Sequence, residues 1–375
     1  MEDGERERMT TVSETAGAIA SAEKILMVMS DELHYESRAF DPDAGMPSSW
    51  RGNVVRSVAA SRLWRSQGRQ VLAIHPEIQQ DVASATSSKF SMEMLRSLPY
   101  ANPMVVYADP ISIPSWRRGS EPDPDAAPYR DEASMRLLGF MVAGQARVGS
   151  TQDVSLDAAL RAVSDSVVLS NDPDTEHLLL LAFAEVLDIK GNRIDYETAS
   201  MSLPLVGKLS FEELVQQQLH RFRFTKGGSH QQRLVWVEQV YRNLLGTMLY
   251  LVSTVLDVER VPTRATRHLT GPACRKPPQM HRVGWKLGAA LSRYRRDVAR
   301  TKGEKTGVQQ APQHRKAHFR TQWYGSRKSP ACMQMRGTCD CPGRHREWVF
   351  ISSYWTRREL LSEDRTYTLH RVELA

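Results

Sequence analysis

The sequence predicts an α+β protein with a mixed α/β N-terminal region, a helical middle and a small, basic, β-rich C-terminal module. Apolar runs typical of buried strands, apolar residues at helical spacing and a change of charge along the chain lead to this prediction. Residues 261–375 hold 24 Lys/Arg and 8 Asp/Glu, whereas residues 1–260 hold 26 Lys/Arg and 35 Asp/Glu. The last third of the chain is therefore expected to attract polyanions.

Composition also predicts where the regions begin and end. The first ten residues carry charges of both signs and no apolar core, so we expect a disordered lead over 1–10. The remaining predicted regions are a mixed α/β region over 11–150, a helical region packed on it over 151–260, a Pro- and Gly-containing linker over 261–281 and the basic module over 282–375.

The N-terminal region shows both helical and strand patterns. Apolar residues recur at helical spacing over 12–36, 53–65 and 91–98. Short apolar runs predict strands over 70–74, 104–108 and 137–144. Between the last two strands, residues 116–130 are rich in Pro and acidic residues, which predicts an exposed loop.

The middle of the chain is expected to be helical. Periodicity predicts helices over 155–169 and 175–187. Ser210 and Glu213 form a capping-box pattern that opens a helix ending near Phe222. A longer helix over 231–258 carries an apolar stripe that is typical of a packed core rather than of a cofactor site.

The basic module is expected to contain one short helix over 283–300 and strands over 317–324, 348–355 and 367–374. Side chains alternate between the two faces of a strand. His318, Arg320 and Gln322 therefore share one polar face of the first strand, while Phe319 and Trp323 share the packing face.

Basic residues interleaved with aromatic residues are typical of a surface that binds nucleic acid. We expect RNA contacts from His314, Arg315, Lys316, His318, Arg320, Gln322 and Tyr324. Aromatic residues such as Trp348 can also stack unpaired bases, although a small module needs many of its aromatic residues for its core. The pattern does not decide whether the chain is an enzyme.

His318 and Arg320 are the candidate catalytic pair. Histidine exchanges protons near neutral pH, and arginine can hold a phosphate with two hydrogen bonds. Together they could promote attack of an RNA 2′-hydroxyl without a metal. Two other interpretations stay open at this point, namely that the pair binds phosphate without chemistry and that His318 has a structural role.

No metal or cofactor is predicted. Cys332, Cys339, Cys341 and His345 are weak zinc candidates, because their spacing does not match a standard zinc finger. His314 and His318 are four residues apart, a spacing that binds zinc well on a helix but not on a strand. The sequence has no glycine-rich phosphate loop of P-loop or Rossmann spacing. No apolar run is long enough to cross a membrane, so we expect a cytoplasmic protein without a membrane partner.

The C-terminal motif resembles the AcrVA-type anti-CRISPR family, in particular its second family directed at production of the type V-A Cas nuclease. The residues that carry the resemblance are His314, Lys316, His318, Phe319, Trp323, Gly325 and Trp348. Weaker similarity extends over residues 98–107, 139–142 and 243–251. The chain differs from the family pattern in having Phe319 at an aromatic position often filled by Trp and a longer, cysteine-bearing insert over 326–347.

The resemblance implies a phage- or plasmid-type anti-defence protein with two parts. The N-terminal part is expected to recognise a nascent polypeptide at the ribosome, and the C-terminal part is associated with loss of the matching messenger RNA. A metal-independent ribonuclease and a protein–protein inhibitor without RNA contact are the alternative functions.

Overall fold

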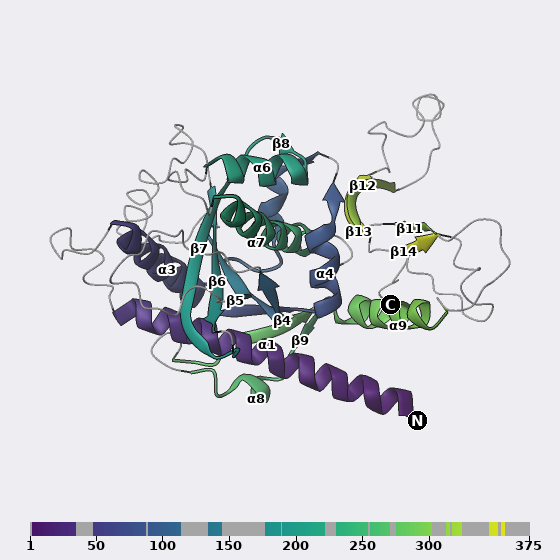
Figure 1. The fold of residues 1–375 in the computed structure, drawn as a ribbon, viewed down its shortest axis with the longest axis horizontal. Helices are drawn as coiled ribbons and strands as arrows, with labels where there is room; N and C mark the ends of the chain where they lie inside the picture. Colours follow the sequence, from purple (N-terminus) through teal and green to yellow (C-terminus); the bar gives the residue numbers. More distant parts are fainter. Residues whose placement is uncertain are drawn as a thin grey trace.

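A mixed seven-stranded sheet forms the centre of the protein (Figure 1). The computed structural model describes residues 2–34, 48–87, 89–113, 134–144, 177–188, 190–221, 230–253, 256–270, 275–301, 313–315, 317–324, 345–351 and 354–356. The strands lie in the order β7 (Arg193–Pro204), β6 (His177–Leu187), β5 (Ser134–Ala143), β4 (Met104–Ile113), β1 (Gln70–Ile74), β10 (Gln279–Val283) and β9 (Val258–Arg260).

The sheet combines two kinds of pairing. Strands β4 to β7 form an antiparallel meander, and β9 is antiparallel to β10. Strand β1 is parallel to both of its neighbours, β4 and β10. The helices and strands therefore form an α+β architecture, as the sequence predicts.

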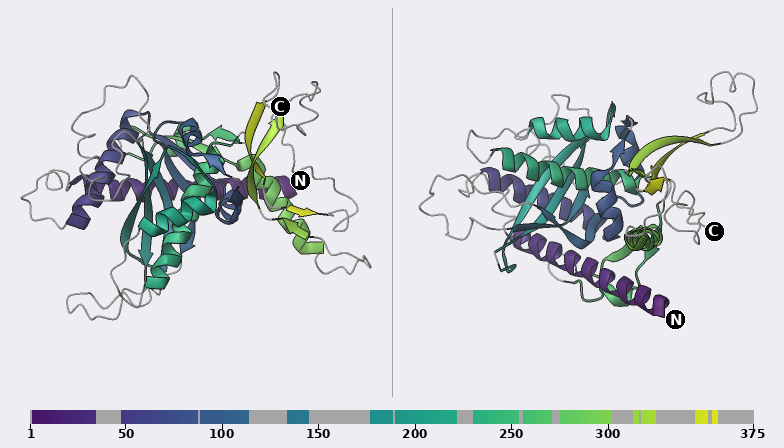
Figure 2. Two further views of the ribbon diagram at one scale, coloured as in Figure 1. Left: turned by 90° about the horizontal axis from the view of Figure 1, so that it is seen from above. Right: turned by 45° about the vertical axis from the view of Figure 1, so that its right-hand side comes forward.

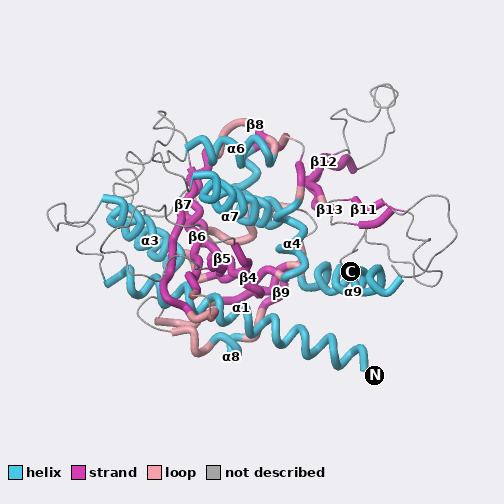
Figure 3. Tube along the Cα trace, viewed as in Figure 1, coloured by secondary structure: helices cyan, strands magenta, loops and turns pink. Residues whose placement is uncertain are grey.

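Helices cover both faces of the sheet (Figure 3). On one face, α1 (Glu2–His34) and α3 (Ser48–Ser66) pack on residues such as Val106 and Phe183. On the other face, α4 (Pro76–Ser84), α6 (Phe211–Arg221) and α7 (His230–Leu251) pack on residues such as Leu72 and Phe140. Each face thus has its own hydrophobic core, and burial of both apolar surfaces holds the layers together.

The remaining elements are short or belong to the C-terminal third. They are β2 (Thr86–Ser87), β3 (Phe90–Ser91), the 3-10 helix η1 (Met92–Ser97), β8 (Lys208–Leu209), α8 (Thr263–Thr266), α9 (Trp285–Thr301), β11 (Gln313–Arg315), β12 (His318–Tyr324), β13 (His345–Ile351) and β14 (Tyr354–Thr356). Figure 2 shows α9 and the strands β11 to β14 at one side of the molecule in both views, as in Figure 1.

Many of the local predictions are confirmed. The strands β1, β4 and β5 and the helices α1, α3 and α9 lie where the sequence predicts them. The segment 91–98 is helical but of the 3-10 type. Helix α1 begins at Glu2, so residues 2–10 are helical where we expected a disordered lead. We expected disorder because this segment carries charges of both signs, but its Glu and Arg residues are also good helix formers.

The prediction of a helix over 175–187 is wrong, because this segment is strand β6. Strand β6 lies between β5 and β7, and both of its faces are buried against the two helical layers at Leu180 and Leu181. A strand buried on both faces is a continuous apolar run, and such a run has the same pattern as a buried helix. The predicted helix over 155–169 lies outside the described residues.

The middle region and the predicted linker also differ from expectation. Strands β6, β7, β8 and β9 fall within residues 151–260, so the described part of this region is not all-helical. Residues 261–281 include α8 and the start of β10, which joins the sheet between β1 and the edge strand β9. Val261, Leu269 and Met280 are buried in the core beneath α1. Proline and glycine in this segment interrupt the elements without separating it from the core.

The capping box at the start of α6 is confirmed. The backbone N–H of Ser210 donates to Oε2 of Glu213 at 2.7 Å, and the backbone N–H of Glu213 donates to Oγ of Ser210 at 3.2 Å. This reciprocal pair satisfies two amide groups that the helix leaves without partners. The box therefore determines where α6 begins.

Helices α4 and α7 approach each other closely at Gly246. A Cβ atom at this position would lie 2.3 Å from the carbonyl oxygen of Val82. The contact lets the apolar stripe of α7, which the sequence predicts to be core, pack against α4 and the sheet. In the part of the chain that the structure describes, no helix has the length and apolar character needed to cross a membrane.

Candidate nucleic-acid interface

Strand β12 carries the residues that the sequence singles out, and it lies between two other strands. It pairs antiparallel with β13 over its whole length and parallel with β2 at His318 and Phe319. Because β2 follows α4 directly, this pairing attaches the C-terminal strands to the N-terminal part of the chain.

The two faces of β12 differ as strand alternation predicts. Ala317 and Phe319 are buried, whereas His318 is half-buried and Arg320 is exposed. The Phe319 ring lies 5.0 Å from the ring of Phe350 on β13, and Phe350 makes an edge contact at 5.3 Å with Tyr250 of α7. One face of the strand is therefore anchored in the core, and the other presents His318 and Arg320.

The strand register determines which positions lie beside this polar face. His318 is opposite Ile351, and Arg320 is opposite the buried Val349. Residues directly opposite each other on an antiparallel pair lie on the same face. The β13 neighbours of His318 and Arg320 are therefore apolar, and the β2 neighbour of His318 is Thr86. None of these three residues is a general acid or base near neutral pH.

A second histidine lies on the partner strand but far along it. His345 is the first residue of β13 and is opposite Tyr324. Tyr324 is six positions along β12 from His318, which corresponds to about 20 Å at the rise of a strand. The register thus keeps the two histidine positions too far apart to act on one phosphodiester.

The other predicted nucleic-acid contacts are divided between two sheets. His314 and Arg315 lie in β11, which pairs with β14 in a separate two-stranded sheet. Gln322 and Tyr324 lie in β12, in register with Glu347 and His345 of β13. Lys316 lies outside the described residues. The structure therefore brings together only part of the predicted set.

The weak zinc candidates are not assembled by the described part of the chain. Cys332, Cys339 and Cys341 lie outside it, and His345 is the start of β13. Among the described residues, no group of three or more His, Cys, Asp or Glu side chains is arranged to hold a metal ion.

Helix α9 lies at the same side of the molecule as the C-terminal strands (Figures 1 and 2). It carries several basic residues. Lys286, Arg293 and Arg296 are exposed on it, while Leu287 and Leu291 are buried against the core. This division between a basic and an apolar face agrees with the sequence prediction.

The start of α9 is held by an acidic residue beneath it. Asp257 Oδ2 accepts a hydrogen bond of 2.6 Å from the backbone N–H of Lys286, and Asp257 Oδ1 accepts one of 3.4 Å from the Tyr250 hydroxyl. Burial, followed by the charge of Asp257, raises the pKa of Tyr250 well above its usual value. The Tyr250 hydroxyl therefore remains a donor. Tyr250 contacts both Asp257, which holds the start of α9, and the Phe350 ring.

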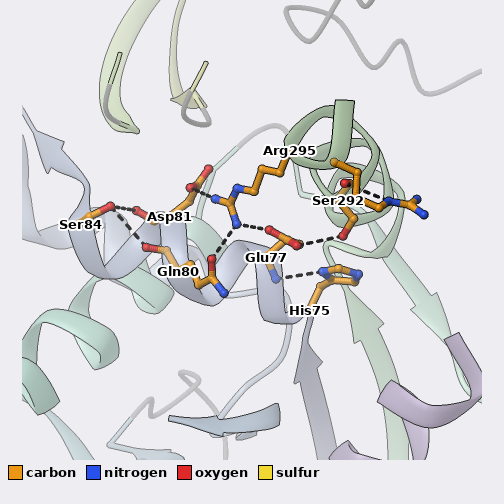
Figure 4. Close-up of polar contacts among 8 residues, drawn as sticks. His75, Glu77, Gln80, Asp81, Ser84, Ser292 and Arg295 are labelled. Carbon is orange, nitrogen blue, oxygen red and sulfur yellow. Dashed lines mark hydrogen bonds and ion pairs between the residues drawn. The ribbon is translucent and has the colours of Figure 1, made fainter. Parts of the chain in front are cut away.

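A polar cluster that was not predicted from the sequence joins α9 to α4 (Figure 4). His75 precedes α4 and caps it, since its Nδ1 accepts a 3.1 Å hydrogen bond from the backbone N–H of Glu77. With Nδ1 acting as acceptor, Nε2 carries the proton and faces Glu14 of α1 at 3.4 Å. Both ring nitrogens of His75 are thus engaged in holding elements together.

Arg295 of α9 is the other centre of this cluster. Its guanidinium pairs with Glu77 and with the buried Asp81, and it donates to Gln80 Oε1 at 2.8 Å. The Ser292 hydroxyl donates to Glu77 Oε1 at 3.1 Å. Glu77 and Asp81 are four residues apart, which is helical spacing, and this was the available signal in the sequence. No helix was predicted after β1, so the two carboxylates were not placed on a common face.

Comparison with known proteins supports one assignment. No curated protein and no solved structure matches the chain. The family model AcrVA2-like, described as the anti-CRISPR type V subtype A2 family, matches residues 72–357, which is most of the chain. The match includes the central sheet from β1 onward, α9 and the strand pair β12–β13. It indicates an anti-defence role of the phage or plasmid kind, and the chain belongs to the anti-CRISPR type V subtype A2 family.

Proposed function

We propose that this anti-CRISPR protein binds RNA through a basic surface formed by the exposed face of β12 and by α9. The observation that carries the proposal is the two-faced character of β12, in which Phe319 is buried and Arg320 is exposed two positions from half-buried His318. A strand fixed on one side holds the cation on the other side at a defined place, which favours phosphate contact.

The basic side chains of α9 support the same interpretation. Arg295 is occupied by Glu77 and Asp81, so its role is to hold the helix. Lys286, Arg293 and Arg296 are exposed residues of α9. Helix α9 lies at the same side of the molecule as the C-terminal strands (Figures 1 and 2). Cations on a helix and on a strand at the same side of the molecule suit a phosphate backbone, which carries regularly spaced negative charge.

Binding is favoured over cleavage by the neighbours of His318. Cleavage by the RNA 2′-hydroxyl needs a base and an acid that reach the same phosphodiester. The β13 neighbours on the His318 face are Val349 and Ile351, and the β2 neighbour of His318 is Thr86. His345 is about 20 Å along the strand. A single histidine and an arginine suffice for phosphate recognition but leave the proton transfers incomplete.

The polypeptide partner is proposed from the family. The N-terminal sheet would recognise a nascent polypeptide, and the basic surface would engage the RNA that encodes it. The attachment of β12 to β2 supports this arrangement, since it ties the proposed RNA surface to the N-terminal part. Substitutions that loosen the pairing of β12 with β2 would then separate polypeptide recognition from RNA binding.

The test is RNA binding by the full chain, measured with a labelled single-stranded RNA over a range of salt concentrations. Arg320→Ala should weaken binding and reduce the slope of log K against log salt by about 0.7, the value for one lost phosphate contact. Lys190→Ala is the matched control. It also removes one positive charge, but from the exposed turn between β6 and β7, at the β7 edge of the seven-stranded sheet.

Equal affinities for Arg320→Ala and Lys190→Ala would remove Arg320 from the proposal. A salt-independent affinity of the unmodified chain would contradict it altogether. RNA products ending in a cyclic phosphate, lost in His318→Ala, would instead establish the nuclease. Capture of a polypeptide that survives nuclease treatment, without any RNA affinity, would establish the protein–protein inhibitor.

A further inference from the structure

A chain of hydrogen-bonded side chains lies near the β9 edge of the seven-stranded sheet, which is a different sheet from that of β12 and β13. His281 of β10 is 7% exposed, and its register partners are Leu72 of β1 and Arg260 of β9. Its Nδ1 lies 3.2 Å from the Tyr100 hydroxyl, and its Nε2 lies 2.9 Å from Oε1 of Gln70. The rings of Tyr100 and His281 are 4.6 Å apart and tilted by 31°.

The direction of each hydrogen bond follows from Gln70. Its Nε2 donates to the carbonyl of Gly68 and to Oε1 of Gln279, both at 3.3 Å, so its Oε1 is the atom that faces His281. His281 Nε2 must then donate to Oε1, which leaves Nδ1 to accept from the Tyr100 hydroxyl. A hydroxyl held by an imidazole that a third group orients is the arrangement found in reactive and binding sites.

Arg260 completes the cluster with a positive charge. It lies directly opposite His281 and is exposed, and within the described ranges no carboxylate forms an ion pair with it. The adjacent Glu259 is at 3.3 Å from Arg282 instead. Burial, and then the charge of Arg260, lower the pKa of His281, and the same charge opposes the effect of burial on the pKa of Tyr100.

We propose that Arg260, Tyr100 and His281 form a binding site for a phosphate group. Guanidinium groups recognise phosphate oxygens with two hydrogen bonds, and an exposed guanidinium beside a hydroxyl has the donors that such a ligand needs. The phosphate belongs to a nucleic-acid strand or to a small phosphorylated molecule. This site does not depend on the proposed RNA surface at β12, so each can fail without the other.

Binding of the phosphate at this site is coupled to protonation of His281. A bound anion offsets the charge of Arg260, so it favours the protonated imidazole. Nδ1–H then donates to the Tyr100 oxygen, which frees the Tyr100 hydroxyl to donate to the phosphate. The groups that face His281 are Gln70 from β1, Tyr100 from the segment before β4 and Arg260 from β9, and Arg260 is the charged one.

The first experiment is calorimetric titration of the full chain with inorganic phosphate at constant ionic strength. Arg260→Ala should weaken binding about tenfold or more, because a charge-assisted hydrogen-bond pair is lost. Arg267→Ala, which removes the same charge from an exposed position just after α8, should bind as the unmodified chain does. Tyr100→Phe keeps the ring that stacks on His281 and should weaken binding by removing the hydroxyl.

The second experiment tests the proton coupling with sulfate, a tetrahedral anion that does not titrate near neutral pH. Sulfate affinity should rise as the pH falls, with proton uptake, and then level off below the pKa of the free site. His281→Gln should remove this pH dependence. Circular dichroism of each variant checks that the fold is retained, and the exposed position of Arg260 keeps the first experiment decisive if His281→Gln unfolds.

The origin of the phosphate is decided by competition. An RNA oligonucleotide with a 5′-phosphate that displaces phosphate better than its 5′-hydroxyl form identifies a strand end, and equal displacement identifies an internal phosphate. Displacement by mononucleotides alone identifies a small molecule. The proposal is overturned if Arg260→Ala and Arg267→Ala bind phosphate equally, or if Tyr100→Phe has no effect while the protein remains folded.

Discussion

Asp81 of α4 is almost completely buried and accepts a hydrogen bond from the guanidinium of Arg295 in α9. The two residues are 214 positions apart in the sequence, so this pair ties the basic C-terminal third to the first parallel strand and its helix. Glu77, one turn earlier on α4, shares the same guanidinium. The position of α9 beside the C-terminal strands therefore depends on a polar contact as well as on apolar packing.

Removing the buried carboxylate should loosen α9. We expect Asp81→Ala to lower the free energy of unfolding by about 1.5–3 kcal/mol, the contribution typical of a hydrogen bond to a charged group. Arg295 is partly exposed, which keeps the loss below that of a fully buried pair. Urea unfolding measures the change, and the exposed neighbour Arg296→Ala should change stability by less than about 0.5 kcal/mol. If Asp81→Ala and Arg296→Ala changed stability equally, the Asp81–Arg295 pair would not be what holds α9.

The ring of Phe350 should anchor the strand pair. Phe350→Ala removes the contacts with Phe319 and Tyr250, and a buried Phe→Ala change costs about 3–5 kcal/mol. We expect a loss of this size in chemical unfolding, accompanied by weaker RNA binding because β12 is no longer held. Ile351→Ala, at the adjacent half-buried position, is the control and should cost less. RNA affinity that survives Phe350→Ala would show that the strand pair does not position the RNA surface.

The contact between α4 and α7 predicts an unusual effect of alanine. Alanine is a better helix former than glycine by about 1 kcal/mol, yet the new Cβ of Gly246→Ala would lie 2.3 Å from the Val82 carbonyl oxygen. Because backbone cannot move aside as a flexible side chain can, we expect a net destabilisation of about 1–3 kcal/mol in urea unfolding. Val235→Ala, at an exposed site of the same helix, should have little effect. A stabilised Gly246→Ala protein would show that the helices separate at little cost.

The capping box predicts a specific dependence on pH. The backbone N–H of Ser210 and then Lys89 lower the pKa of Glu213 below its usual value of 4.5. The carboxylate of Glu213 therefore stabilises the folded state above the unfolded-chain pKa, and this contribution is lost as the pH falls through the lower folded pKa. Thermal unfolding from pH 6 downward should show a steeper acid loss for the unmodified chain than for Glu213→Gln. Glu212→Gln, one residue earlier, should follow the unmodified chain, and an identical acid loss in all three would rule out this role.

Local sequence patterns predicted much of the fold because they depend on near neighbours. The limits of β1, the capping box at Ser210 and the alternation at Phe319 and Arg320 each follow from residues a few positions apart. The pattern could not distinguish a strand from a helix at Leu178–Phe183, because an apolar run buried on both faces looks the same in either form.

The α+β class, the basic C-terminal third and the polar face with His318 and Arg320 could all be predicted from the amino-acid sequence. Three features became apparent only in the folded chain: β10 joins the sheet between β1 and β9, Asp81 pairs with Arg295, and Arg260 lies opposite His281. The physical reason is the range of the interactions. Hydrophobic periodicity and helix capping act within a few residues, whereas strand order and buried ion pairs join segments that meet only after the chain has folded.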